Sequence, residues 1–306
     1  MRIGIHSFSA GPSLDEQLKL AVDAEEAGFD SFWIGHIFGH DALTLAALAG
    51  PRTKRIELGT AVAQTYARHP FILAQQAATI QAAAGGRFTL GVGPSHHVLV
   101  QGMWGLSYEH VARHVREYLS VLRPLIDQGN VAFSGEDYRV AGALQIPDRK
   151  PCPVLISALA PMMLRIAGEL ADGTITWMTG PKTVAEHIVP RINSAAEEAG
   201  RPKPRVIVSL PVAVTDDVAA ARQEAGKLFE MYGQLPNYRR MLDREGAAGP
   251  ADVAVVGNEA DVERQIRAIA DTGATDFGVW TYPVGEDAQA SLDRTWSLMK
   301  GLVGKL

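Results

Sequence analysis

Short apolar runs alternate with amphipathic stretches along most of this chain. The clearest example lies between Pro151 and Trp177. The run from Pro153 to Ile156 has no polar interruption, which is typical of a strand covered on both faces. From Pro161 onward, apolar residues recur at helical spacing, and the β-branched and aromatic residues from Thr174 to Trp177 predict a second strand. We therefore predict a β-α-β unit with parallel strands.

The same alternation recurs along the chain and predicts eight strands joined by helices. Residues 131–145 break it and are expected to form a hairpin, whereas residues 236–256 give no assignable pattern. The predicted strands are 3–8, 30–34, 56–62, 87–92, 153–156, 174–177, 206–213 and 276–280, and the predicted helices are 14–27, 42–49, 70–84, 107–127, 161–171, 183–199, 218–232 and 259–272. Alternation without two separable halves favours a closed (β/α)8 TIM barrel, forming one domain over residues 1–306.

Composition and charge narrow the class of protein. Of the 306 residues, 47% are apolar and 21% are charged, and the formal net charge is −5. Because Lys and Arg are scattered, we expect no nucleic-acid and no membrane partner. The chain starts as a strand and has no apolar run of membrane-spanning length, so a cytoplasmic location is expected. The single Cys152 is expected to be a small structural residue.

Candidate chemistry lies at the carboxyl ends of the strands, where barrels carry their sites. These positions are small, aromatic, hydroxylated or histidine-bearing and include almost no carboxylates: Phe8-Ser9, Gly35-His36, Ala61 to Gln64, Gly93 to His97, Ser157 to Ala160, Thr176 to Thr179, Pro211 and Tyr282. Such a rim suits a flat aromatic cofactor better than a metal ion or an acid pair. The helix start at Ala160 to Met162 suits an anion, especially phosphate, and a tight turn is the alternative explanation of its small residues.

Sequence patterns for other kinds of site, such as metal, dinucleotide or serine-nucleophile sites, are weaker. His110 and His114 have the spacing of zinc ligands on a helix, but no acidic residue lies between them, and we expect them on a solvated helix face. Gly91-Val92-Gly93 lacks the rest of a dinucleotide-binding fingerprint, and no serine stands in a nucleophile elbow. We therefore predict no metal site.

Four motifs in order resemble the bacterial luciferase-like superfamily, in particular its branch that uses the 5-deazaflavin coenzyme F420. They are Leu58 to Val62, Arg68 to Pro70, Gly86 to Gly93, and Ser157 to Pro161 followed by Ala171-Asp-Gly173. The resemblance covers nearly the whole chain. It implies a (β/α)8 barrel with an insertion after strand four, usually a homodimer, and an F420-dependent oxidoreductase acting on a small-molecule substrate.

The resemblance also implies roles for individual residues. Ala61 and Val62 would form a bulge that often carries a non-prolyl cis peptide and would press on the deazaflavin face. Gly93, Pro94, Ser95 and His96 would flank the ring or its side chain. The ribityl phosphate end would be held by Ser157, Ala158, Leu159, Ala160 and Pro161 with Thr176, Trp177 and Met178.

The chain departs from relatives that act on a sugar phosphate or an alcohol. Where they place an acid followed by His after strand two, it has His36-Ile37, and His96 replaces their Glu after strand four. Hydride transfer to or from an unidentified organic substrate is therefore expected, with His36 or His96 as the proton donor or as a structural ring bonded to a carbonyl. An FMN-dependent monooxygenase and a non-catalytic ligand-binding barrel are the alternatives.

Overall fold

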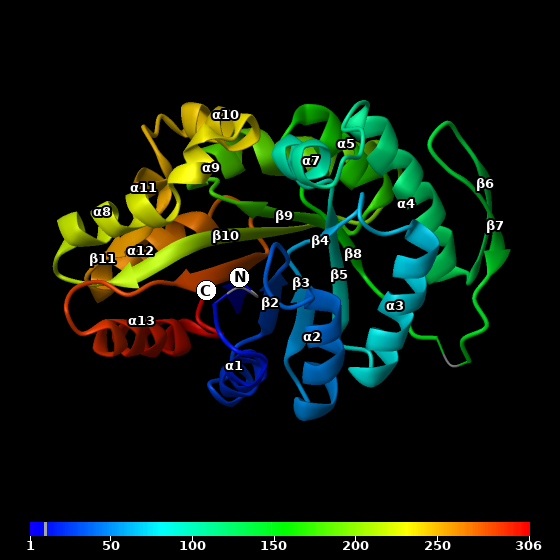
Figure 1. The fold of residues 1–306 in the computed structure, drawn as a ribbon. Coiled ribbons are helices and arrows are strands. Elements are labelled where there is room, and N and C mark those ends of the chain that lie inside the picture. The colour runs from blue at the N-terminus through cyan, green and yellow to red at the C-terminus, as the bar shows by residue number, and fades with distance from the viewer. Residues whose placement is uncertain (9–10, 148) are drawn as a thin grey trace.

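Eight parallel strands close into a barrel in the computed structural model, which describes residues 1–8, 11–147 and 149–306 (Figure 1). Around the barrel they are β1 (Arg2–Phe8), β2 (Ser31–Gly35), β3 (Glu57–Thr60), β5 (Phe88–Gly93), β8 (Val154–Ile156), β9 (Gly173–Trp177), β10 (Arg205–Val214) and β12 (Asp276–Thr281). Closure comes from β12, which pairs with both β10 and β1. The predicted (β/α)8 barrel is confirmed; Ser9 lies outside the described residues.

Helices cover the outside of the barrel, and most were predicted within a few residues. They are α1 (Leu14–Glu26), α2 (Ala42–Ala49), α3 (Pro70–Ala83), α4 (Val111–Asp127), α5 (Pro161–Leu170), α7 (Val189–Glu198), α8 (Val218–Leu228), α12 (Glu259–Ala270) and α13 (Ala288–Leu302). The capping box of α1 is present, since Ser13 N–H donates to Glu16 and Glu16 N–H donates to the Ser13 hydroxyl. Among the described residues, no helix has the length and apolar character that crossing a membrane requires.

The central β-α-β unit forms as the sequence predicts. Ile156 of β8 lies opposite Thr174 of β9 in a parallel ladder, and Pro161 is the first residue of α5. The Asp172 carboxylate accepts the N–H of Val154 at 2.8 Å and forms an ion pair with Arg123 of α4 at 2.7 Å. This side chain therefore fastens the turn before β9 to the start of β8.

The third barrel strand is interrupted where a bulge is expected. β3 ends at Thr60, and the chain pairs again with β5 only as β4 (Ala63–Gln64). The peptide bond between Ala61 and Val62 is cis, which confirms that expectation. The Thr60 hydroxyl donates to the Gly91 carbonyl at 2.7 Å and accepts the Gly91 N–H at 3.0 Å, so a side chain replaces the missing ladder contact.

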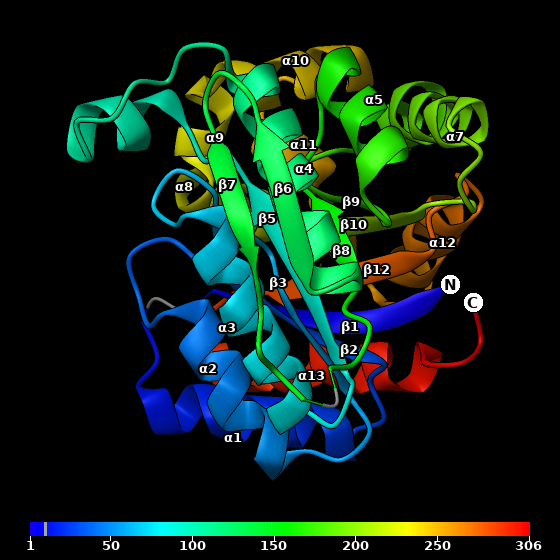
Figure 2. The same cartoon turned by 90° about the vertical axis from the view of Figure 1, so that its right-hand side faces the viewer.

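The long connection after β5 contains the predicted hairpin, formed by β6 (Asn130–Ser134) and β7 (Arg139–Ala143) outside the barrel (Figure 2). Glu117 of α4 holds its turn by accepting the N–H groups of Glu136, Asp137 and Tyr138 at 2.7 to 3.1 Å. The loop before α4 includes a π-helical segment, η2 (Val98–Met103), and α4 starts at Val111 instead of residue 107.

The structure corrects the sequence prediction in the last third of the chain. The predicted helix 183–199 is divided into α6 (Pro181–Thr183), the π-helical η3 (Val184–Ile188) and α7, and the predicted helix 218–232 into α8 and α9 (Glu230–Gln234). The unassigned residues 236–256 form α10 (Pro236–Glu245), α11 (Pro250–Val253) and β11 (Val255–Gly257), which pairs with β10. Only Met241 and Leu242 of α10 are buried, so its apolar stripe is too short to recognise from sequence.

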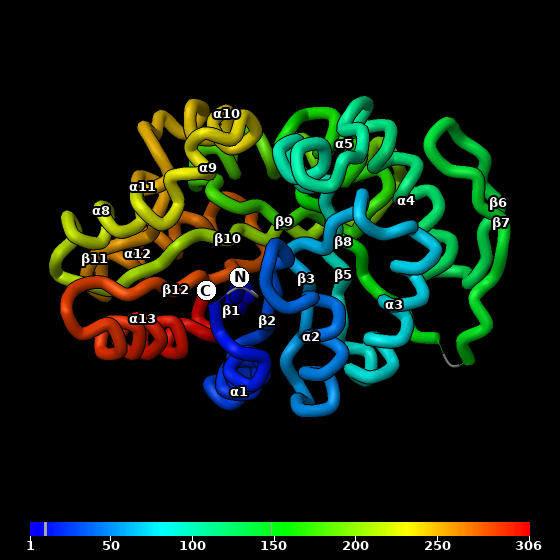
Figure 3. The backbone as a smooth tube through the Cα atoms, in the orientation of Figure 1, coloured from blue at the N-terminus to red at the C-terminus, as the bar shows by residue number. Residues whose placement is uncertain are grey.

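Charged side chains close the end of the barrel where the strands begin. Arg205 of β10 contacts Glu57 at 2.8 Å and Asp276 at 2.7 Å, and Arg2 contacts the same two carboxylates. Burial would raise the Glu57 pKa, but the arginines hold it below its usual value, while the two carboxylates raise the Arg205 pKa. The chain ends lie together on one side of the barrel, with the Met1 amine donating to the Leu306 carbonyl (Figure 3).

We expect Arg205→Gln to lower the free energy of unfolding by about 3 kcal/mol, because Glu57 and Asp276 lose the more buried of the two arginines that they share. Urea denaturation measures the change. Arg264→Gln breaks the exposed ion pair with Asp261 and should change the free energy of unfolding by at most about 0.5 kcal/mol. Equal effects of the two substitutions would contradict a structural role for the Arg205 cluster.

Candidate cofactor site

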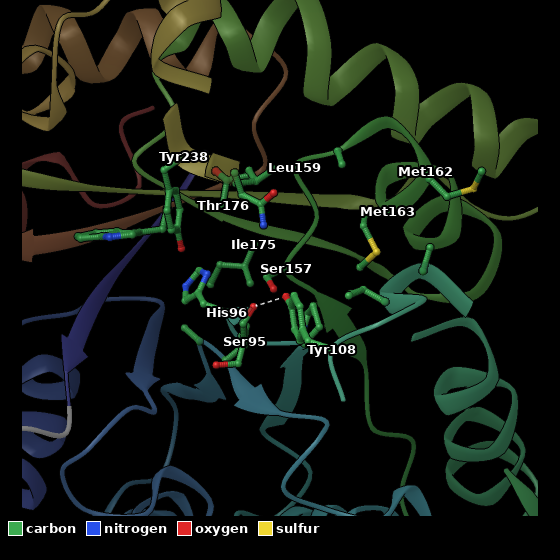
Figure 4. A pocket seen from close by; sticks show the side chains of 18 of the residues that line it. Ser95, His96, Tyr108, Ser157, Leu159, Met162, Met163, Ile175, Thr176 and Tyr238 are labelled. Carbon is green, nitrogen blue, oxygen red and sulfur yellow. Dashed lines mark hydrogen bonds between the residues drawn. The ribbon is translucent and has the colours of Figure 1, made fainter. Parts of the chain in front are cut away.

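A cavity of about 360 Å³ opens at the carboxyl ends of the strands (Figure 4). Most of the residues expected to bind the cofactor line it: Ala61, Val62, Pro94, Ser95, His96, Ser157, Leu159, Ala160, Thr176 and Trp177. In Figure 4, His96 and Tyr238 lie on one side of the cavity and Met162 and Met163 on the other, with Ser157 and Ile175 between them. The structure thus brings together segments separated by more than a hundred residues.

Four residues of the expected set do not line this cavity. Ala158 and Met178 are fully buried, and Pro161 faces a neighbouring cavity beside α5. Gly93 lies behind the wall, where an added Cβ would stand 2.3 Å from the Ser157 hydroxyl oxygen and 2.7 Å from a Val62 methyl. A side chain at Gly93 would therefore push apart two residues that form the wall.

The loop between β8 and α5 presents unpaired backbone donors to the cavity. The Ala158 N–H donates to the Thr174 hydroxyl at 3.2 Å, and this hydroxyl donates to the Ile156 carbonyl at 2.9 Å, which fixes the loop. Ala160 is the N-cap of α5 and has no side chain that could cap the helix. First-turn N–H groups lack intrahelical partners, and Pro161 has none, so Met162 and Met163 supply the free donors.

The opposite wall comes from the loop that follows β5. Ser95 has a φ of 63°, in the left-handed region, and its carbonyl accepts the Tyr108 hydroxyl at 2.8 Å (Figure 4). The His96 ring packs against Tyr238, with ring centroids 5.6 Å apart, and burial lowers the His96 pKa. His96 is therefore a neutral ring at pH 7 that faces the cavity.

A smaller hollow of about 100 Å³ shares part of this wall and extends toward β1 and β2. His36 and His96 both line it, so the two candidate proton donors meet at one place. His36 does not line the larger cavity. Trp177, Tyr232 and Tyr238 complete an aromatic surface around the hollow.

The His36 ring lies near a carboxylate and not against a carbonyl. Its Nε2 lies 3.6 Å from an Asp41 carboxylate oxygen, and Asp41 is also bonded to Arg68. Burial lowers the His36 pKa, Arg68 lowers it further, and Asp41 opposes both effects. The Gln64 amide donates to the His36 carbonyl at 2.6 Å and holds the backbone there. A histidine held in this way can exchange a proton with a bound molecule.

Sequence reasoning missed several residues of the site. His6 of β1 lines both hollows, and burial lowers its pKa to about 4. Neither ring nitrogen has a hydrogen-bond partner among the described residues. The sequence did place His6 on the first strand, but Tyr108, Asn237 and Tyr238 come from loop and helix segments that carried no recognisable signal.

Comparisons with known proteins fit this geometry. The Luciferase-like monooxygenase family matches residues 1–291. The chain belongs to this luciferase-like family. It is 32% identical over 262 residues to the uncharacterized protein Rv1360 of Mycobacterium tuberculosis, covering 79% of this chain and 77% of that protein. It is 37% identical over 207 residues to an F420-dependent glucose-6-phosphate dehydrogenase of Nakamurella multipartita, covering 62% and 60%.

A solved structure shows the same fold. The coenzyme F420 dependent tetrahydromethanopterin reductase of Methanopyrus kandleri superposes with a TM-score of 0.80 at 23% identity, covering 100% of this luciferase-like chain and 98% of that one. At this identity the likeness shows a shared barrel.

The structure of this luciferase-like chain corrects the prediction that His110 and His114 both lie on a solvated helix face. His114 is buried, not solvated: it stacks on Tyr66 with ring centroids 3.8 Å apart and lies 2.9 Å from the Thr65 hydroxyl. The hairpin and the loop after β4 cover this face of α4, which the sequence could not show. His110 is exposed at the N-cap, and within the described ranges no three His, Cys, Asp or Glu residues gather as a metal site.

Cys152 is buried, as befits a structural residue, and burial raises its thiol pKa to about 12. The thiolate is therefore negligible at pH 7, and the thiol is not a nucleophile at that pH.

The buried His114 of the luciferase-like barrel predicts a pH dependence of stability. Burial lowers its pKa from 6.5 to about 4, so between these values the unfolded chain binds more protons and stability falls as the pH drops. From pH 7 to pH 4.5, wild type should lose about 2 kcal/mol more unfolding free energy than His114→Phe. Urea denaturation at both pH values tests this, with the exposed His40→Phe as control; equal losses in wild type and His114→Phe would refute it.

Proposed function

We propose that this protein is an F420-dependent oxidoreductase that transfers a hydride between the deazaflavin and a small, uncharged organic substrate. The observation that carries the proposal is the cavity itself, which combines apolar lining residues with the uncapped first turn of α5. Val62, Ile175 and Trp177 give a planar ring an apolar surface, and the first turn of α5 offers N–H groups to a phosphate. The F420-dependent relatives support the choice of cofactor.

When bound, the deazaflavin would supply the carbon that accepts or releases the hydride. The chain's own residues orient the ring, exclude water and move the proton. Trp177 and Tyr238 line both hollows and shield their junction from solvent. His36 and His96, both neutral near pH 7, line the smaller hollow, where either ring can exchange a proton with a substrate oxygen.

The walls of the smaller hollow favour an uncharged substrate. Among the described residues that line it, none is Lys, Arg, Asp or Glu. A phosphate there would lose its water without gaining a cation, because the nearby Arg68 is already bonded to Asp41. We therefore propose a substrate unlike the sugar phosphate acted on by the Nakamurella relative. We also propose that the protein forms a homodimer.

The rival function is an FMN-dependent monooxygenase, favoured by the reaction for which the family is named. Titration of the protein's fluorescence with F420 and with FMN, each oxidised and reduced, separates the two. We expect F420 to bind at least about tenfold more tightly than FMN. Tight binding of FMN without binding of F420 would reverse the assignment.

The same titration tests the phosphate position. Ser157→Asp should weaken F420 binding by about 10- to 100-fold, because it places a negative charge beside the first turn of α5. Ser297→Asp adds the same charge on exposed α13 and should leave binding unchanged. Unchanged affinity in Ser157→Asp would place the phosphate elsewhere.

His36→Gln should lower kcat by about 10²-fold while leaving the F420 dissociation constant unchanged, because His36 lines only the smaller hollow. The measurement is F420-linked turnover of whichever ketone, alcohol or activated alkene in a panel the wild type accepts. The exposed His40→Gln is the control. Full activity of His36→Gln would remove His36 as the proton donor, and F420 binding without turnover by the wild type would favour a ligand-binding barrel.

A further inference from the structure

A third cavity, of about 270 Å³, adjoins the cofactor site at Ala160. It lies between the start of α5, His187 of η3 and the C-terminal half of α10. α10 spans both cavities, since Asn237 and Tyr238 line the larger one and Arg240 and Arg244 line this one. Figures 1 and 2 show α10 and α5 at the same end of the barrel.

Two arginines of this cavity have no counter-ion. Arg240 and Arg244 are one helical turn apart, and neither forms an ion pair with a carboxylate among the described residues. The acidic residue on the wall, Asp243, is already paired with Arg239 at 2.8 Å. Within the described ranges, Arg240 donates only to the Asn237 amide oxygen, at 2.5 Å. Two like charges four residues apart destabilise a helix, so an anion between them would be favourable.

His187 gives an independent sign of a ligand. It is 2% exposed, and its Nε2 lies 2.7 Å from the Leu159 carbonyl, which can only accept, so Nε2 carries the hydrogen. Nδ1 is then a buried polar atom without a partner in the described part of the chain, on a ring that lines the cavity. Burial lowers the His187 pKa, the hydrogen bond to Leu159 opposes this, and the charges of Arg191 and Arg244 lower it further. An anion nearby would raise the pKa and allow Nδ1–H to donate.

The neighbouring cofactor cavity differs in charge from this one. Among the described residues, the wall of the larger cavity contains no Lys or Arg. Amide groups alone would meet an anionic group there, while the unpaired cations lie beyond Ala160. We propose that the cavity between α5 and α10 is an anion subsite that binds a phosphate or carboxylate group through Arg240, Arg244 and His187. The group is either part of the anionic side chain of the cofactor, a source that rests on the proposed function, or a free anion.

The test neutralises both arginines in R240Q/R244Q. The control R264Q/R267Q removes two charges from exposed α12, outside all three cavities. Fluorescence titration measures binding of F420 and of its deazaflavin nucleoside, which has neither phosphate nor carboxylates, at low and high salt. Thermal unfolding with and without inorganic phosphate measures binding of a free anion.

If the cofactor supplies the anion, R240Q/R244Q binds F420 at least about tenfold more weakly than the control and with less salt dependence, while nucleoside binding is unchanged. If a free anion is the ligand, the variant loses only the stabilisation by phosphate. NMR titration of the ring should show a rise in the His187 pKa when the anion binds to wild type. F420 affinity, salt dependence and phosphate stabilisation all equal to those of the control would overturn the subsite.

The two proposals can fail separately. If wild type binds neither F420 nor the nucleoside, the proposed cofactor is refuted. The anion subsite still stands if phosphate stabilises wild type but not R240Q/R244Q. If wild type and R240Q/R244Q bind F420 with the same affinity, and phosphate does not stabilise wild type, the anion subsite is refuted. The proposal that F420 is the cofactor then stands.

Discussion

The site depends on how closely three barrel strands approach one another at their carboxyl ends. An added Cβ at Gly91 would lie 2.0 Å from the Thr60 carbonyl, and one at Gly93 would lie 2.3 Å from the Ser157 hydroxyl. Only residues without side chains at these positions let the bulge at Ala61 and Val62 reach the mouth of the barrel. The position of this wall of the cavity therefore follows from steric exclusion in β5 and not from any binding residue on that strand.

The barrel separates charge between its two ends. Where the strands begin, Arg205, Glu57 and Asp276 form a compact ionic cluster that fills the opening. Where they end, the cavity walls are neutral, and burial keeps His6 and His96 uncharged near pH 7. A neutral wall lets a bound ring pack without competing charges, while backbone N–H groups and the arginines of α10 provide positive potential at one side only. This asymmetry fits a molecule with a flat apolar part and an anionic tail.

Much of the fold could be predicted because its signals are local. The β-α-β unit from Pro151 to Trp177 has unbroken apolar strands, a proline at the first helical position and short loops, and the structure confirms each. The hairpin of β6 and β7 was foreseen from its glycines. Helix α10 was not, since two buried residues give no periodic stripe and its position is fixed by contacts with the distant α6: Glu245 accepts the N–H of Thr183 at 2.7 Å.

By itself, the sequence determined that eight strands alternate with helices and that small and aromatic residues stand at the strand ends, because burial and backbone preference act over a few neighbouring residues. Only the tertiary structure decided which of those ends form one wall. It placed Arg68 beside Asp41 and His36, covered His114 with Tyr66 and set the arginines of α10 next to Ala160. The physical reason is that electrostatic environment and shape depend on segments brought together by barrel closure, and distance along the chain carries no information about such neighbours.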